Sequence, residues 1–201
     1  LGVATLSEAR ALRDSGIAAP ILVFGYTPPW QAREAVALGV ACTLFDFDTA
    51  RALAEAAAAF GRSASAHLKI DTGMARLGLP PADALAFLQE LRALPHAEAL
   101  HMDGIYTHFA SADSADLTSA EAQLARFMGL LRKLEDAQLR PPCAHAANSA
   151  ALLRLPAARL DMARPGIACY GLAPSAAAPL PPDFRAALSF HTEVAQVKEL
   201  P

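Results

Sequence analysis

Short apolar runs alternate with longer amphipathic segments along most of this chain. The predicted strands lie at 20–24, 41–45, 66–70, 100–107, 142–146 and 159–162, and the last of these also holds the charged residues Arg159 and Asp161. Segments with helical spacing lie at 7–15, 28–38, 49–60, 81–94 and 118–138, and a brief one follows Ser149. Continuous short apolar runs are typical of strands buried on both faces. Strands of this kind, separated by helices, predict a parallel sheet with crossover connections.

Capping and turn residues mark several of the helix boundaries. Ser7 is the predicted N-cap of the first helix, and Gly16 ends that helix. Pro28 stands at the first turn of the second helix and Gly39 at its end. These positions support the division of the chain into repeated strand–helix units.

Two architectures fit six or seven such units: a doubly wound sheet and a (β/α)₈ barrel. A complete barrel takes roughly 250 residues, so 201 residues would suit a barrel that lacks its first βα unit. No GxGxxG motif follows a first strand, which weakens the dinucleotide-binding alternative. Residues 186–200 alternate between apolar and polar, which predicts an antiparallel strand and a change of domain near residue 186.

Composition excludes several classes of function. With 54% hydrophobic and 18% charged residues, the chain can bury one sizeable core. A net charge of −3 without a basic stripe argues against a nucleic-acid partner. No apolar run reaches eighteen residues, and the start has no signal-peptide pattern, so no membrane span is expected. Three widely spaced cysteines indicate neither a disulfide framework nor a zinc site, and favour a cytoplasmic location.

Polar residues just after the apolar runs are the candidate ligand-binding residues, because ligands bind at the carboxyl ends of parallel strands. Lys69 stands within a strand between two apolar neighbours, and either reaches solvent or points toward a ligand. Arg76 follows in a glycine-containing loop, and His108 comes directly after the next run, at 100–107. An arginine suits a carboxylate or phenolate, although a surface position would explain it equally well.

The later strand ends carry a second group of candidates. His145, Asn148 and Ser149 lie where a short strand gives way to a helix, and Ser149 is suited to cap that helix. Arg164 precedes a Pro-Gly turn whose free N–H groups, at 166 and 167, could form a phosphate cradle. His, Asp and Glu show no metal-ligand spacing, so no metal is expected.

Four motifs, in this order, resemble the barrel domain of bacterial alanine racemases: HLKIDTGMARLG, GIYTHFASAD, HAANSAA and LDMARPGIACYG. The resemblance covers essentially the whole chain. It implies a pyridoxal-phosphate enzyme of fold type III, with a (β/α)₈ TIM-type barrel followed by a C-terminal β domain. The boundaries that follow are 1–185 for a partial barrel domain and 186–201 for the start of the β domain.

The resemblance also implies roles for individual residues. Arg164 would contact the pyridine nitrogen of the cofactor, with His108 beside the ring. Ser149 and the backbone of Gly166 and Ile167 would hold the phosphate. Arg76 would contact the substrate region, and Lys69 corresponds to a lysine that is often carbamylated, which would turn an ammonium beside Arg76 into an anion.

Two catalytic groups of the family have no counterpart in these 201 residues. The Schiff-base lysine motif, similar to VKANAYGHG, and the tyrosine of the C-terminal domain are both absent. Racemisation with two bases needs both groups, so the chain is expected to be an inactive fragment of a cytoplasmic homodimer that makes D-alanine for peptidoglycan. A racemase of another amino acid, such as serine, and a non-catalytic pyridoxal-phosphate-binding protein are the alternatives.

Overall fold

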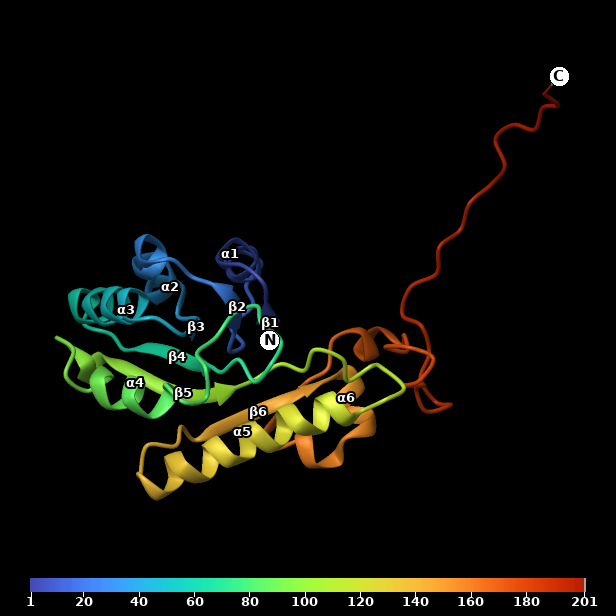
Figure 1. The fold of residues 1–201 in the computed structure, drawn as a ribbon. Helices are drawn as coiled ribbons and strands as arrows, with labels where there is room; N and C mark the ends of the chain where they lie inside the picture. Colours follow the sequence, from blue (N-terminus) through green and yellow to red (C-terminus); the bar gives the residue numbers. More distant parts are fainter. Residues whose placement is uncertain (201) are drawn as a thin grey trace.

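Seven parallel strands form one sheet whose spatial order follows the sequence (Figure 1). The computed structural model describes residues 1–200. Each strand pairs in parallel with the next one along the chain. The strands are β1 (Gly2–Val3), β2 (Leu22–Tyr26), β3 (Ala41–Leu44), β4 (Ala64–Lys69), β5 (Leu100–Tyr106), β6 (Cys143–Asn148) and β7 (Met162–Arg164).

Helices connect these strands and flank the outer side of the sheet (Figure 1). The α-helices are α1 (Leu6–Asp14), α2 (Ala32–Leu38), α3 (Phe47–Phe60), α4 (Ala84–Leu91), α5 (Thr118–Asp136) and α6 (Ser149–Arg154). Four 3₁₀ turns add η1 (Pro29–Gln31), η2 (Ala97–Ala99), η3 (Pro156–Ala158) and η4 (Ile167–Tyr170).

The sequential strand order decides between the two predicted architectures. A doubly wound sheet reverses its strand order at a switch point, whereas a barrel does not. Here β1 and β7 remain unpaired with each other within residues 1–200, yet both border one cavity of about 670 Å³. The predicted incomplete barrel is therefore confirmed, and this cavity, which we call the β1–β7 slot, occupies its open side.

Successive side chains of each strand point alternately outward and inward, and in β4 the outer face is apolar while the inner face is polar. In β4, Ala66 and Leu68 pack in the core between sheet and helices. Ser65, His67 and Lys69 must therefore face inward, since successive side chains of a strand point to opposite sides. Barrel interiors are usually filled by branched apolar residues, so a polar interior indicates a functional demand.

Two apolar clusters between the sheet and the helices supply the hydrophobic core. One packs α3, α4, α5 and α6 against β4, β5 and β6, with Phe87, Phe127 and Leu134 among its large members. The other packs α1, α2 and α3 against β2 and β3, with Val23 and Leu53 fully buried. Burial of such side chains is the main favourable term in folding.

Several predicted boundaries differ from those observed. Thr5, not Ser7, caps α1, because its side chain accepts from the amide of Glu8 while the Glu8 carboxylate accepts from the Thr5 amide. The predicted strand at 159–162 is displaced to Met162–Arg164, and the helix predicted at 81–94 is shorter. The brief β1 was not predicted, since two residues carry too little pattern.

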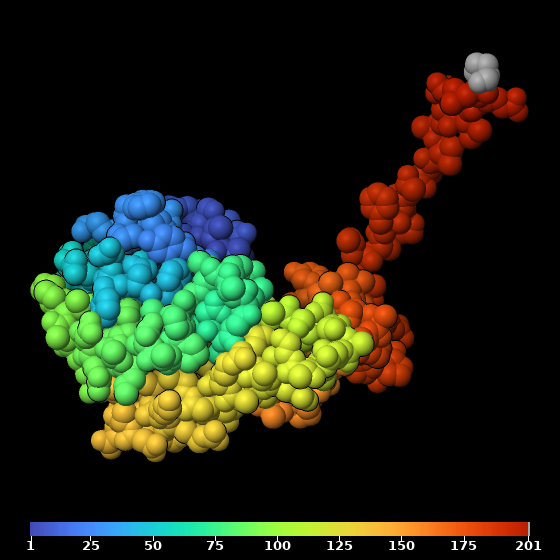
Figure 2. Space-filling view, viewed as in Figure 1, coloured from blue at the N-terminus to red at the C-terminus, as the bar shows by residue number. Residues whose placement is uncertain are grey.

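The antiparallel strand predicted for residues 186–200 does not form. The amide of Ala187 still donates to the carbonyl oxygen of Tyr170. Residues 188–200 then leave the barrel as an extended arm without strand pairing (Figures 1 and 2). An isolated strand lacks partners for its backbone N–H and C=O groups, which explains why the alternating pattern alone does not produce one. The predicted change of domain near residue 186 stays a prediction. Pro201 lies outside the described residues.

Within residues 1–200, no helix is both long and apolar enough to cross a membrane. Cys42, Cys143 and Cys169 are all free thiols, as the spacing predicted.

Candidate functional site

Arg164, the last residue of β7, forms the centre of the polar rim at the carboxyl ends of the strands. Its Nη1 lies 2.6 Å from Nδ1 of His145. Its Nη2 donates to the carbonyl oxygens of Thr107 (2.7 Å) and Ala146 (3.0 Å), and lies 3.2 Å from Nδ1 of His108. Residues of β6, β7 and the segment directly after β5 thus meet at one guanidinium group.

The charge of Arg164 has no anionic partner. No carboxylate lies within ion-pair distance of its guanidinium among residues 1–200. Burial lowers the pKa of Arg164 to about 10, so the group stays protonated at neutral pH. A buried cation without a counter-ion is costly, and its Nε–H makes no hydrogen bond within the described part of the chain. The site therefore presents a fixed positive charge to whatever binds there.

The histidines around Arg164 are neutral. Burial, reinforced by the charge of Arg164, lowers the pKa of His145 to about 2 and that of His108 to about 4. His67 of β4 lies on the other side of His145, with its Nδ1 2.8 Å from Nε2 of His145. Burial lowers the pKa of His67 as well. These rings surround Arg164 with acceptors rather than with competing charge.

Tyr106 of β5 packs against both His145 and Arg164 from within the barrel. Its ring stacks on His145 at 4.7 Å and 6°, and the guanidinium carbon of Arg164 lies 5.1 Å from its centroid. Its hydroxyl lies 2.7 Å from Oγ1 of Thr43, which donates to the carbonyl oxygen of Val23. Burial raises the pKa of Tyr106 to about 12, so the phenol stays protonated and donates to Thr43.

Ser149 joins the start of α6 to the turn after β7. Its Oγ accepts from the amides of Gly166 (2.9 Å) and Ala168 (3.3 Å). The predicted capping role is wrong, because Asn148 is the N-cap and its Oδ1 accepts from the amide of Ala151. Ser149 is therefore free to act elsewhere, and its own hydroxyl proton remains available as a donor beside the amide of Ile167.

Lys69, the last residue of β4, is 4% exposed and points into the barrel. Its Nζ lies 5.3 Å from the centroid of Tyr106 and makes no hydrogen bond or ion pair to any described residue. Burial, with the nearby charges of Arg76 and Arg164, lowers its pKa to about 8. The sequence left two possibilities for Lys69, and the structure places it inward.

Arg76 lies on the loop after β4, which Asp71 organises. The Oδ1 of Asp71 accepts from the amides of Gly73, Met74 and Ala75 at 2.9–3.1 Å. Arg76 itself is exposed and forms no side-chain hydrogen bond within residues 1–200. The loop thus holds a second cation close enough to Lys69 to perturb its pKa, with the guanidinium still free to move.

A buried glutamine of α5 fixes the two loops that carry these groups. Gln123, 1% exposed, donates through Nε2 to Oγ1 of Thr72 and to the carbonyl oxygen of His108, both at 3.2 Å. Its Oε1 accepts from the amide of Ala110 at 2.9 Å. One side chain therefore connects the loop after β4 to the segment after β5.

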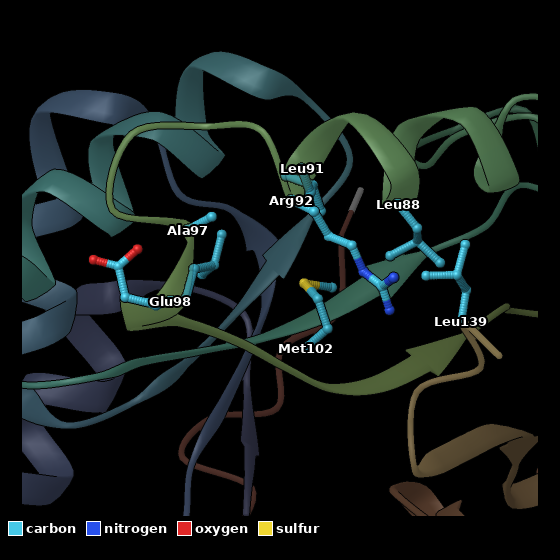
Figure 3. Close-up of a pocket in the computed structure, with 8 residues that line it drawn as sticks. Leu88, Leu91, Arg92, Ala97, Glu98, Met102 and Leu139 are labelled. Atoms are coloured by element: carbon cyan, nitrogen blue, oxygen red, sulfur yellow. The ribbon is translucent and has the colours of Figure 1, made fainter.

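The predicted residues His108, Ser149, Arg164, Gly166 and Ile167 line one cavity of about 430 Å³. Tyr170, which belongs to the same sequence motif as Arg164, borders the β1–β7 slot and is 63% exposed. A further hollow of about 350 Å³ lies at the opposite end of the sheet, where β5 begins (Figure 3). There Arg92 extends from α4 toward Leu88 and Leu139, while Glu98 points away (Figure 3). None of the predicted site residues borders that hollow.

Three contributing residues were not selected from the sequence: His67, Tyr106 and Gln123. A signal for His67 was present, because it precedes Lys69 by two residues and so shares its strand face. Nothing in the sequence distinguishes Gln123 from the exposed polar residues of α5. Among residues 1–200, no cluster of three or more His, Cys, Asp or Glu side chains could hold a metal ion.

The fold and the rim together define an α/β-barrel protein with a cationic candidate site at the carboxyl ends of its strands. The family model described as "Alanine racemase, N-terminal domain" matches residues 1–174. The chain belongs to this family.

Related proteins agree with this assignment. The alanine racemase of Desulfovibrio desulfuricans is 44% identical over 201 residues, which are 100% of this chain and 53% of the relative. The structure of alanine racemase from Streptomyces coelicolor A3(2) has a TM-score of 0.83 and 37% identity, over 92% of this chain and 49% of that chain. Alanine racemase from Clostridium difficile 630, in complex with cycloserine, has a TM-score of 0.82 and 35% identity, over 89% and 48%. The chain thus spans about half the length of the relatives it matches.

Proposed function

We propose that the protein acts in the pyridoxal-phosphate-dependent interconversion of L- and D-alanine, with this chain contributing the barrel that holds the cofactor. The observation that carries the proposal is the uncompensated positive charge of Arg164, placed among neutral histidines at the barrel rim. Family membership supports the same function. When bound, pyridoxal phosphate supplies an electron-withdrawing ring that eases removal of the proton from Cα of an amino acid.

The surroundings of Arg164 fit the ring nitrogen of this cofactor. A guanidinium group only donates hydrogen bonds, so it would leave an aromatic nitrogen unprotonated. Because the lowered pKa values keep His108 and His145 neutral, neither ring is an acid that could protonate that nitrogen. An unprotonated ring nitrogen limits how far charge is drawn away from Cα, which favours returning a proton over side reactions.

The Ser149 turn fits the phosphate of the cofactor. The Ser149 hydroxyl and the amides of Gly166 and Ile167 are uncharged donors at the edge of the same cavity as Arg164, and the Gly166 amide would exchange its bond to Ser149 for one to the phosphate. Backbone amides grouped in a turn are common anion sites. Arg164 and this turn would therefore hold opposite ends of one ligand.

Arg76 and Lys69 would act on the substrate side. We propose that Lys69 is carbamylated: its neutral amine adds CO₂ to give a carbamate and releases one proton. An amine whose pKa is lowered to about 8 is partly unprotonated near neutral pH and can react in this way. The resulting anion would attract Arg76, whereas an ammonium would repel it.

The family resemblance supports four further parts of the proposal. The substrate is alanine, the product D-alanine serves peptidoglycan synthesis, the protein is cytoplasmic, and it acts as a homodimer. The relative that binds cycloserine supports a small, amino-acid-like ligand. A β domain beginning near residue 186 would supply the tyrosine expected of the family, and a further lysine would form the Schiff base.

The test uses the product of the complete gene. The wild type should bind pyridoxal phosphate and interconvert the alanine enantiomers, and Arg164→Glu should reduce kcat at least about 100-fold because it reverses the charge that faces the ring nitrogen. Arg132→Glu, on the exposed face of α5, should retain activity. Activity on serine but not alanine would change the substrate, and absence of cofactor binding by the wild type would refute the proposal.

A further inference from the structure

The direction of the hydrogen bonds between Arg164 and His145 can be assigned. Nη1 of Arg164 and Nδ1 of His145 are 2.6 Å apart, and a guanidinium group has donors but no acceptors. Nδ1 of His145 must therefore accept. Because the ring is neutral, its single proton lies on Nε2.

The same reasoning continues to His67. The Nε2–H of His145 faces Nδ1 of His67 at 2.8 Å, so Nδ1 of His67 accepts and its own proton lies on Nε2. The donors thus run in one direction, from Arg164 through His145 to His67. If His67 presented a proton to His145 instead, His145 would have to donate toward Arg164, and two donors would face each other.

Gly104 of β5 makes room for this arrangement. A Cβ atom at residue 104 would lie 2.2 Å from Nδ1 of His67 and 2.5 Å from its Cε1. The pairing of β4 with β5 shifts register between Ala66 and His67, at the point where Gly104 pairs with His67. The position of the His67 ring therefore depends on a glycine in the adjacent strand.

We propose that His67 is a positioning residue for Arg164. By accepting a hydrogen bond from the Nε2–H of His145, it fixes the tautomer and ring plane of His145, on which Tyr106 stacks. The His145 ring then holds Nη1 of Arg164, and leaves the remaining N–H groups of Arg164 for the cofactor's ring nitrogen. The inference rests on the proposed function only for the identity of that ligand.

The first measurement needs no cofactor. In the full-length protein labelled with ¹⁵N-histidine and ¹⁵N-arginine, a scalar coupling across the N–H···N bond should connect Nε2 of His145 to Nδ1 of His67. The chemical shifts should show the Nε2–H tautomer at His145. A proton on Nδ1 of His145, or the absence of this coupling, would overturn the proposal.

Matched variants then test the effect on Arg164. His67→Asn offers an amide oxygen near the position of Nδ1, whereas His67→Leu has a similar size and no acceptor. His67→Leu should shift the guanidinium signals of Arg164 and weaken pyridoxal-phosphate binding roughly ten-fold, while His67→Asn should stay within about three-fold of the wild type. Equal affinities for the Leu and Asn variants would overturn the positioning role.

Glycine variants provide an independent test that keeps the imidazole. Gly104→Ala should displace the His67 ring, and so reproduce the loss of coupling and of affinity seen in His67→Leu. Gly129→Ala, on α5 with no atom within 4 Å of the added Cβ, should match the wild type. If wild type shows the coupling without binding pyridoxal phosphate, the proposed function fails, and the guanidinium shifts alone decide whether His67 positions Arg164.

Discussion

Two buried cations determine what the barrel interior can bind. Lys69 and Arg164 both lack an anionic partner within residues 1–200, and both have lowered pKa values because burial disfavours their charged forms. Arg164 offsets part of that cost with four hydrogen bonds to neutral acceptors. Lys69 has no such bonds, so its effect on the free energy of unfolding of the protein depends directly on whether the amine is protonated.

Lys69 should make stability pH-dependent in buffer free of CO₂. With a pKa of about 8 when folded and 10.5 as the ordinary value, the unfolded chain binds more protons between these limits. The free energy of unfolding should therefore rise as the pH increases from about 8 to about 10.5. Lys69→Met should remove this rise and stabilise the protein at pH 7 by on the order of 2 kcal/mol, after allowance for solvent screening.

Urea unfolding across that pH range measures the effect, with the exposed Lys133→Met as control. Added bicarbonate should stabilise the wild type at pH 8, if the carbamate forms, and should have no effect on Lys69→Met. A wild-type stability that is flat from pH 8 to 10.5 would contradict the lowered pKa. An intact protein mass without added CO₂ after bicarbonate treatment would count against carbamylation.

The candidate site residues could be selected because each lies at or just after the end of a predicted strand. Lys69, His108, Ser149 and Arg164 all lie where a strand ends, and parallel strands bring these ends to one edge. The partners that orient them could not be found in the same way. His145 was noted only as a neighbour of Ser149, and the link from His67 to Arg164 depends on ring positions that no spacing rule specifies.

At the scale of single elements, α5 supports the site as well as the core. Its apolar side packs against the sheet, while Gln123 on the same buried side satisfies groups from two loops. Replacing Gln123 with Leu would leave the carbonyl oxygen of His108 and the amide of Ala110 without this partner. Buried polar groups that lose their partners cost more than the hydrogen bond itself contributed.

Gln123→Leu should therefore lower the free energy of unfolding by about 2–3 kcal/mol. Gln89→Leu, on the exposed surface of α4, should change it by less than about 0.5 kcal/mol. Equilibrium urea denaturation of both variants measures the difference. Equal stabilities would show that Gln123 does not hold the two loops.

The order and type of the elements were predictable, whereas their ends were less so. Continuous apolar runs identified six of the seven strands, and glycines such as Gly39 and Gly61 end helices in the left-handed conformation that favours glycine. Residues 159–162 were predicted as a strand although Arg159 and Asp161 are charged, and β7 begins only at Met162. The alternation of apolar and polar residues at 186–200 likewise did not predict the structure correctly, since a strand also requires a neighbouring strand.

At the scale of the whole molecule, residues 188–200 form an arm that contributes little to the barrel. Its apolar side chains are 79–89% exposed: Leu188, Phe190, Val194, Val197 and Leu200. Removing residues 188–201 should change the free energy of unfolding by less than about 0.5 kcal/mol and reduce aggregation. A truncation that begins before Ala178, which is fully buried, should be clearly destabilising.

Urea midpoints and light scattering of the two truncated proteins test this prediction. A large loss of stability on removing 188–201 alone would show that the arm packs on the barrel.

The strand order has a consequence for how the polypeptide acquires its shape during synthesis. Every strand from β2 onward docks beside the one made just before it. Each of these pairings closes a loop of one strand–helix unit and not a loop across the whole chain, which limits the entropy lost at each step. A chain leaving the ribosome can therefore add one strand–helix unit at a time to an edge that already exists. Only the meeting of β7 with the region of β1 must wait until the last unit has emerged.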